Sequence, residues 1–176
     1  MAGISLRHIS SCLSSTRIFR IMTNTASSLG AACSAYTFVE GASPTIKEDE
    51  DLVKQTLSMV GSCEKLPESN FHAFTGLAGS GPAFVYTILE ALADGAVLSG
   101  LPRATARKFA AQMALGASKM ALESGKHTGE LKDAVTSPAG TTISGVAALE
   151  RGKIRGVLME AVQASSNRSK ELSGEK

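Results

Sequence analysis

Residues 131–152 read LKDAVTSPAGTTISGVAALERG. Pro138 stands where a helix would begin, because proline is favoured at the first helical position, and Ser137 before it is the predicted N-cap. The backbone N–H groups from Ala139 to Thr142, with the hydroxyls of Thr141 and Thr142, then lie at a helix start, which is a ready site for an anion. Gly140 also lets a ligand approach the backbone closely. The stretch therefore predicts a site for a carboxylate or phosphate, or a capped helix without a ligand, and spacing alone leaves both open.

The residues on either side predict helices throughout the chain beyond residue 67. Residues 84–98 are apolar on nearly every side, which predicts a helix buried in a large core or between subunits. Residues 103–123 are rich in alanine, and residues 153–172 carry an amphipathic stripe. These apolar faces exceed what about 110 residues can bury internally. We therefore expect a homodimer with interlocked helices.

The first 66 residues predict a small α/β part. Strands are expected at 17–22, 34–39 and 62–66. A turn is expected at Gly41–Pro44, followed by a helix that Thr45 caps, with Glu48 completing a capping box. The predicted domains are therefore residues 1–66 and residues 67–176.

The first 39 residues contain three arginines, many serines and no acidic residue. That is the composition of a mitochondrial transit peptide. The same residues also predict folded structure, with helical spacing at 4–14 and the first two strands after it. Composition alone leaves both interpretations open.

Several classes of partner are not expected. The net charge is +2 and tryptophan is absent, which argues against a nucleic-acid surface. No stretch approaches the ~18 uninterrupted apolar residues of a membrane span, so no membrane partner is predicted. Three cysteines without ligand spacing predict no metal site. The run TGLAGSGPAF at 75–84 lacks the G-x-G-x-x-G spacing of a dinucleotide loop, and its glycines predict close helix packing or a kink.

Three segments together resemble the pyrroline-5-carboxylate reductase family in their order and spacing. They are TGLAGSGPAF at 75–84, ALADGAVLSGLPRATA at 91–106 and LKDAVTSPAGTTISGVAALERG at 131–152. RIFRIMTNTASSLG at 17–30 resembles the family's last Rossmann strand and the loop after it. The resemblance implies a mixed fold, a truncated α/β Rossmann remnant followed by an all-α helical dimerisation domain.

The resemblance also implies a function: reduction of 1-pyrroline-5-carboxylate to L-proline by NADPH or NADH, the last step of proline biosynthesis, in the cytoplasm or alternatively in mitochondria. Homodimers or higher homo-oligomers are the implied assembly. The implied site has Thr142 as the catalytic hydrogen-bond donor to the ring nitrogen, Asn24 facing the nicotinamide, and a substrate pocket formed by Val135, Ser137, Gly140, Thr141 and Thr142.

The chain departs from the family pattern in two loops. Ala139 stands where the family usually has glycine, and Thr23 and Ala26 replace the two prolines of a M-P-N-T-P loop. The family's glycine-rich phosphate loop has no counterpart in these 176 residues, which favours a truncated form. The arginine-rich start is then Rossmann sequence rather than a targeting peptide. The alternative function is a non-catalytic helical dimerisation module that lacks the cofactor phosphate loop.

Overall fold

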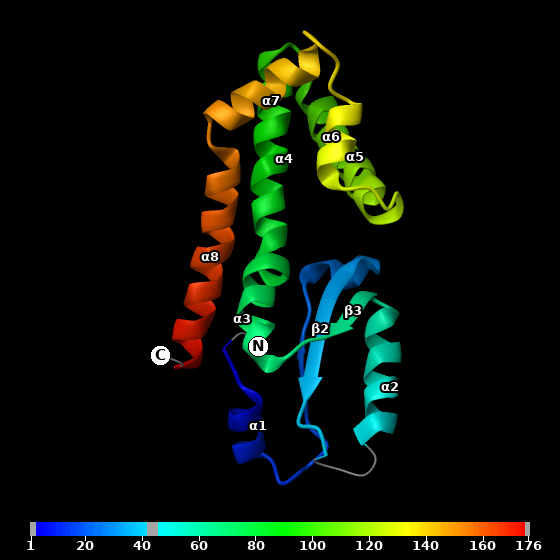
Figure 1. Cartoon of the computed structure of the whole chain (residues 1–176), viewed down its shortest axis with the longest axis vertical. Helices are drawn as coiled ribbons and strands as arrows, with labels where there is room; N and C mark the ends of the chain where they lie inside the picture. Colours follow the sequence, from blue (N-terminus) through cyan, green and yellow to red (C-terminus); the bar gives the residue numbers. More distant parts are fainter. Residues whose placement is uncertain (1–2, 42–45, 175–176) are drawn as a thin grey trace. The chain divides into compact units, whose positions relative to one another are not determined.

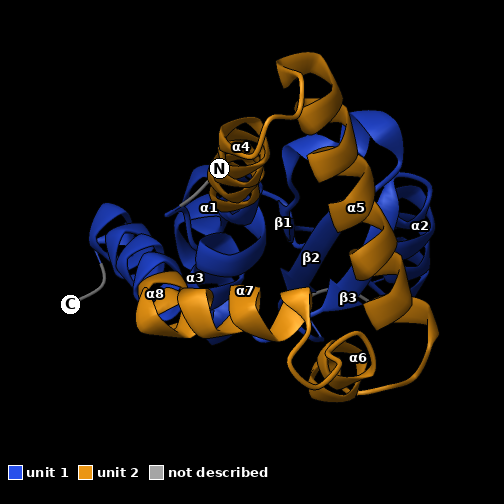
Figure 2. Ribbon diagram, turned by 90° about the horizontal axis from the view of Figure 1, so that it is seen from above, with its two compact units in different colours: residues 1–82, 159–176 blue, residues 83–158 orange. Residues whose placement is uncertain are grey.

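The computed structural model describes residues 3–41 and 46–174. It divides into two compact units, which Figure 2 colours separately. Unit 1 is residues 1–82 together with 159–176, and unit 2 is residues 83–158. Residues 67–82 and the last turns of the final helix belong to the same compact unit as the sheet, and the division into domains at residues 66 and 67 stays a prediction.

The order of elements confirms the predicted fold class, a small α/β part followed by helices (Figure 1). The elements are α1 (Leu6–Cys12), β1 (Phe19–Met22), η1 (Thr25–Leu29), β2 (Ala32–Phe38), α2 (Ile46–Ser58), β3 (Gly61–Lys65), η2 (Glu68–Asn70), α3 (Phe71–Phe74), η3 (Thr75–Gly79), α4 (Gly81–Leu98), α5 (Arg103–Glu123), α6 (Thr128–Ala134), α7 (Thr141–Arg151) and α8 (Ile154–Ser173).

The sheet of unit 1 has the strand order β1-β2-β3. β1 pairs antiparallel with β2, and β2 pairs parallel with β3. Helix α2 makes the crossover that a parallel pair requires. Tyr36, Phe38 and Ile46 form the buried centre between the sheet and α2. All three predicted strands are confirmed, to within about two residues at each end.

The arginine-rich start of the chain is folded into unit 1. The Leu6 side chain is buried, and its backbone N–H donates to Glu68 Oε1 at 2.6 Å. The same carboxylate oxygen accepts from Arg20 Nη1 at 2.8 Å. The guanidinium of Arg20 also lies 4.6 Å from the centre of the Phe71 ring. These contacts support the interpretation of this region as folded structure, because an arginine that is only 6% exposed needs such partners.

The glycine-rich run in unit 1 packs against the end of α8, as the sequence predicts. A Cβ added to Gly76 would lie 2.1 Å from Ser166 Oγ and 2.6 Å from the Val162 carbonyl oxygen. The helix widens here into the π-helical turn η3. Two side-chain contacts flank this point, His72 Nδ1 to Ser169 Oγ at 2.8 Å and Ser80 Oγ to Ser165 Oγ at 2.6 Å. The run is therefore a site of close helix packing.

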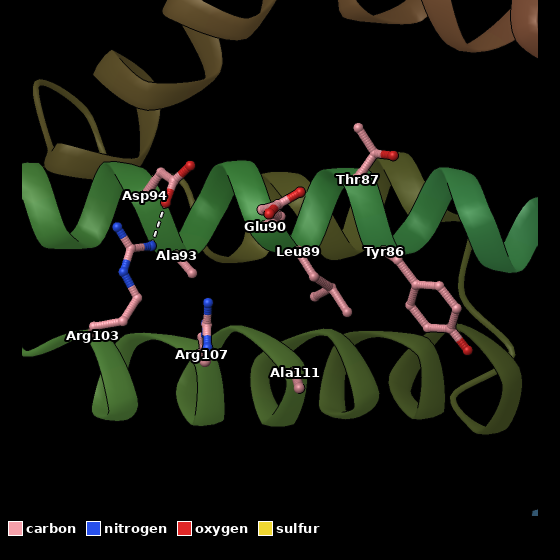
Figure 3. A pocket seen from close by; sticks show the side chains of 9 residues that line it. All are labelled: Tyr86, Thr87, Leu89, Glu90, Ala93, Asp94, Arg103, Arg107 and Ala111. Carbon is pink, nitrogen blue, oxygen red and sulfur yellow. Dashed lines mark hydrogen bonds and ion pairs between the residues drawn. The ribbon is translucent and has the colours of Figure 1, made fainter.

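In unit 2, small side chains bring α4 and α5 together. Ala93, Ala106 and Ala110 are buried between the two helices. Figure 3 shows the groove beside this contact, where Arg103 and Asp94 form an ion pair across it. Of the two predicted alternatives for residues 84–98, burial in a core of the single chain is wrong, and burial between subunits stays a prediction. Most of α4 is intermediate or exposed, and Ala93 is its buried residue.

One further expectation is changed by the structure, and another lies largely outside the described residues. The polar segment 23–30, expected as a loop, contains the 3-10 helix η1, which Asn24 caps. The predicted turn at Gly41–Pro44 and the cap at Thr45 fall largely outside the described residues.

Among the described residues, the helical run Glu68–Leu98 is long and apolar enough to cross a membrane by length and composition. A single helix of this kind does not distinguish a span from a helix that packs against protein.

Candidate functional site

The predicted substrate stretch forms a tight turn followed by the first turn of α7. The backbone N–H of Gly140 donates to the Ser137 carbonyl oxygen at 3.1 Å. Pro138 and Ala139 are the two central residues of this turn. A Cβ added to Gly140 would lie 2.3 Å from Ser137 Oγ, so the serine hydroxyl occupies the space beside the helix start. The turn thus brings Ser137 to the N-terminus of α7.

The structure corrects the predicted capping. Ser137 is not the N-cap, and Pro138 is not the first helical residue. Helix α7 begins at Thr141 with Gly140 as its N-cap, and no side chain caps it. The physical reason is the left-handed backbone of Ala139, with φ of 58°, which a helix cannot continue through. The N–H groups of the first turn therefore lack a side-chain acceptor.

The polar groups at this helix start are available to a ligand. The N–H groups in the first turn of an α-helix have no intrahelical partner, and in α7 they include those of Thr141, Thr142 and Ile143. None of the hydrogen bonds that the described residues form uses the hydroxyls of Ser137, Thr141 or Thr142. All of these side chains are exposed in the single chain. The dipole of α7 adds a partial positive charge at the same point.

Helix α6 fixes the other side of the turn. His127 caps it, since its Nδ1 accepts from the Gly129 N–H at 3.1 Å while its own N–H donates to Glu130 Oε2 at 3.2 Å. At the other end, Thr136 Oγ1 donates to the Lys132 carbonyl oxygen at 2.6 Å. Val135 lies within the span of this bond, directly before Thr136, and is 66% exposed. The structure therefore places Val135 beside the same loop as Ser137, within unit 2.

Asn24, the predicted cofactor contact, belongs to unit 1. Its Nδ2 donates to the Ala78 carbonyl oxygen at 3.0 Å, and its Oδ1 accepts from the Ala26 N–H at 3.3 Å. The side chain thus ties the start of η1 to η3. Thr23, one of the residues that replace a proline, shares a hydrogen bond with Ser34 Oγ at 2.9 Å. The Asn24 amide thus makes one hydrogen bond through its nitrogen and one through its oxygen to protein groups, and its nicotinamide contact stays a prediction.

One feature of the site, the backbone of Ala139, does not follow from the sequence. The letters Ser-Pro-Ala-Gly fit two structures, a capped helix start and a turn with proline at its second position. The signal for the turn is Gly140, because glycine is common after the central residues of such turns. The backbone at position 139 has a positive φ, which glycine adopts more easily than alanine, so Ala139 in place of the family's usual glycine adds strain to this turn.

The amino-acid sequence was compared with family models and with curated proteins, and both comparisons match the same family. A family model described as pyrroline-5-carboxylate reductase dimerisation matches residues 68–172. Pyrroline-5-carboxylate reductase from Pisum sativum is 48% identical over 98% of this chain and 62% of the relative. The protein of that name from Methanosarcina acetivorans is 49% identical over 97% of this chain and 63% of the relative. The chain thus spans a little over three fifths of the length of these curated relatives.

Solved structures agree with the sequence comparison. A pyrroline-5-carboxylate reductase from Coxiella burnetii superimposes with a TM-score of 0.91 at 35% identity, covering 98% of this chain and 63% of that chain. The Plasmodium falciparum pyrroline carboxylate reductase with NADP bound superimposes with a TM-score of 0.87 at 27% identity, covering 98% of this chain and 68% of that chain. With a family model over more than half of its residues and whole-chain likeness to these proteins, the chain belongs to the pyrroline-5-carboxylate reductase family.

Proposed function

We propose that this chain carries the substrate side of an enzyme that reduces 1-pyrroline-5-carboxylate to L-proline with NADPH or NADH. The observation that carries the proposal is the start of α7. There, three N–H groups and the hydroxyls of Ser137, Thr141 and Thr142 are free of partners within the described chain. Hydrogen bonds of this kind to a carboxylate are stronger than neutral ones because the acceptor is charged.

Each site residue has a proposed role. Ser137, Gly140 and Thr141 hold the carboxylate, and Val135 forms an apolar wall. Thr142 donates a hydrogen bond to the ring nitrogen, which gains electron density as hydride reaches the neighbouring carbon. Donors placed where charge develops lower the barrier because they need no reorganisation during the reaction.

The nicotinamide cofactor supplies the hydride, and the protein orients it. Within this chain, Asn24 is the proposed contact. The 176 residues contain no G-x-G-x-x-G phosphate loop, and the Asn24 amide is bound to Ala78 and Ala26. The residues present therefore do not by themselves fit a complete dinucleotide.

We propose a homodimer or higher homo-oligomer, located in the cytoplasm or alternatively in mitochondria. The apolar side chains of α5 support the assembly, because Phe109, Met113 and Met120 are 57%, 52% and 56% exposed in the single chain. Exposed apolar residues repeated along one helix are typical of an interface between proteins. The name of the matching family model, which refers to dimerisation, supports the same proposal.

The test is calorimetric titration of the chain with L-proline and, separately, with NADPH. We expect L-proline to bind, and Thr142→Ala to weaken it about tenfold, the equivalent of one hydrogen bond to a charged or polar ligand group. Thr142→Ser keeps the hydroxyl and is expected to bind nearly as the native chain. Thr56→Ala is the matched control, since that hydroxyl bonds to Leu52 within α2.

The two functions predict different results with NADPH. Binding of NADPH, together with its oxidation by 1-pyrroline-5-carboxylate, would support the reductase and exclude a non-catalytic dimerisation module. L-proline binding without NADPH binding would favour the module. Absence of L-proline binding at millimolar concentration would contradict the proposed carboxylate site itself.

A further inference from the structure

Ala139 has a backbone conformation that alanine adopts at a cost. Its φ is 58°, and among the described residues only Lys153, with φ of 55°, is another non-glycine residue in this region. A Cβ in the left-handed region lies too close to the following carbonyl oxygen. Such strained residues persist where the surrounding structure holds them, and they are concentrated at functional sites.

The strained residue controls where Ser137 lies. The turn closes through the 3.1 Å bond from the Gly140 N–H to the Ser137 carbonyl oxygen. A proline at the second position of a turn and a positive φ at the third belong together, and glycine is the usual residue at that third position. If Ala139 relaxes to negative φ, the turn opens and the Ser137 hydroxyl leaves the start of α7.

We propose that Ala139 is a positioning residue that limits the affinity of the carboxylate site. The inference rests on the proposed function, since it concerns the same helix start. The closed turn presents Ser137 and the α7 N–H groups together, whereas the open turn separates them. Because alanine disfavours the closed turn, only a fraction of molecules is ready to bind, and the measured dissociation constant rises by the inverse of that fraction.

Substitutions at position 139 should therefore change affinity in the order of their tolerance for positive φ. Glycine adopts it freely, so Ala139→Gly is expected to bind L-proline about fivefold more tightly, the equivalent of about 1 kcal/mol. Valine is β-branched and resists it further, so Ala139→Val is expected to bind more weakly than the native chain. The side chain at 139 is exposed, so neither substitution disturbs a core.

Lys153→Gly is the matched control. It relieves the same kind of backbone strain in the same unit, after the C-terminal end of α7, whereas the turn precedes the N-terminal end of this helix. Both glycine variants are expected to raise the melting temperature, but only Ala139→Gly should tighten L-proline binding. A gain in affinity from Lys153→Gly as well would show a general effect of stability and overturn the inference.

A double-mutant cycle tests whether Ser137 is the residue being positioned. The gain from Ala139→Gly should shrink when Ser137→Ala is present, because the hydroxyl that the turn positions is then missing. A full fivefold gain in that background would contradict the role. If the native chain binds L-proline and Ala139→Gly binds it no more tightly, the positioning role of Ala139 is contradicted and the proposed function is not. If neither the native chain nor Ala139→Gly binds L-proline, the proposed function is contradicted as well.

Discussion

Tyr36 shows how a single buried residue couples the sheet to α2. Its phenol lies in the core of unit 1 and donates to Glu50 Oε1 at 2.9 Å. Burial first, and then the neighbouring Glu50 carboxylate, raise the pKa of Tyr36 from 10.0 to about 12. The folded protein therefore favours the neutral phenol, since ionisation would place a negative charge in the core beside another one.

The raised pKa predicts a loss of stability at alkaline pH. The unfolded chain ionises Tyr36 near pH 10 and the folded chain near pH 12, so the contribution of Tyr36 is complete below pH 10. It is lost progressively as the pH rises to about 12. Urea unfolding of the native chain and of Tyr36→Phe across this range should show a steeper decline in the native chain.

The assignment to Tyr36 can be checked by absorbance. The chain has two tyrosines, so a Tyr86→Phe background leaves Tyr36 as the only source of a tyrosinate signal. An increase in that signal well before the chain unfolds, with a midpoint near pH 10, would contradict the raised pKa.

At the scale of elements, the contact between η3 and α8 depends on the absence of a side chain at Gly76. We expect Gly76→Ala to lower the free energy of unfolding by about 2–4 kcal/mol, because the new methyl would meet a backbone carbonyl that cannot move alone. Chemical denaturation followed by circular dichroism measures the change.

Gly81→Ala is the matched control for this contact. Gly81 belongs to the same helical run, and a Cβ added there meets nothing within 4 Å. Alanine is a better helix former than glycine, so this variant should be neutral or slightly more stable. Equal destabilisation by both variants would show that helix propensity or assembly, and not the Gly76 contact, is responsible.

The sequence predicts most elements because their signals are local. The limits of α5 follow from Pro102 at its N-cap and from the break after Glu123, and the strands follow from short apolar runs between turn residues. The prediction of the start of α7 is wrong because two local structures compete for the same residues. Pro138 fits a helix start and a turn equally well, and only the backbone of Ala139 decides between them.

Burial is harder to predict, because it depends on distant or missing neighbours. The apolar residues of α4 predict a buried helix, yet Tyr86 is 63% exposed in the single chain. Conversely, the arginine-rich start suggests a targeting peptide, although Arg20 is held by Glu68 from 48 residues away. The composition of a segment gives its side chains, but it does not show which distant residues will contact them in the folded protein.

At the scale of the whole molecule, the exposed apolar face of α5 predicts self-association. Sedimentation velocity at micromolar concentration should give a dimer or a larger species. Met113→Asp places a charge within this face and should shift the chain toward monomer, because a buried unpaired charge opposes association. Lys119→Ala, a change at an exposed residue of the same helix, is expected to leave the mass unchanged. A monomeric native chain would contradict the proposed assembly.

The discontinuity of unit 1 has a consequence for synthesis on the ribosome. The hydrogen bond between His72 and Ser169 joins residues 97 positions apart, and residues 159–176 belong to the same unit as the sheet. Unit 2 leaves the exit tunnel before these last residues do, so Gly76 lacks its contacts with Val162 and Ser166 while about half of the chain is translated. Completion of unit 1 is therefore a late step when the chain folds during its synthesis.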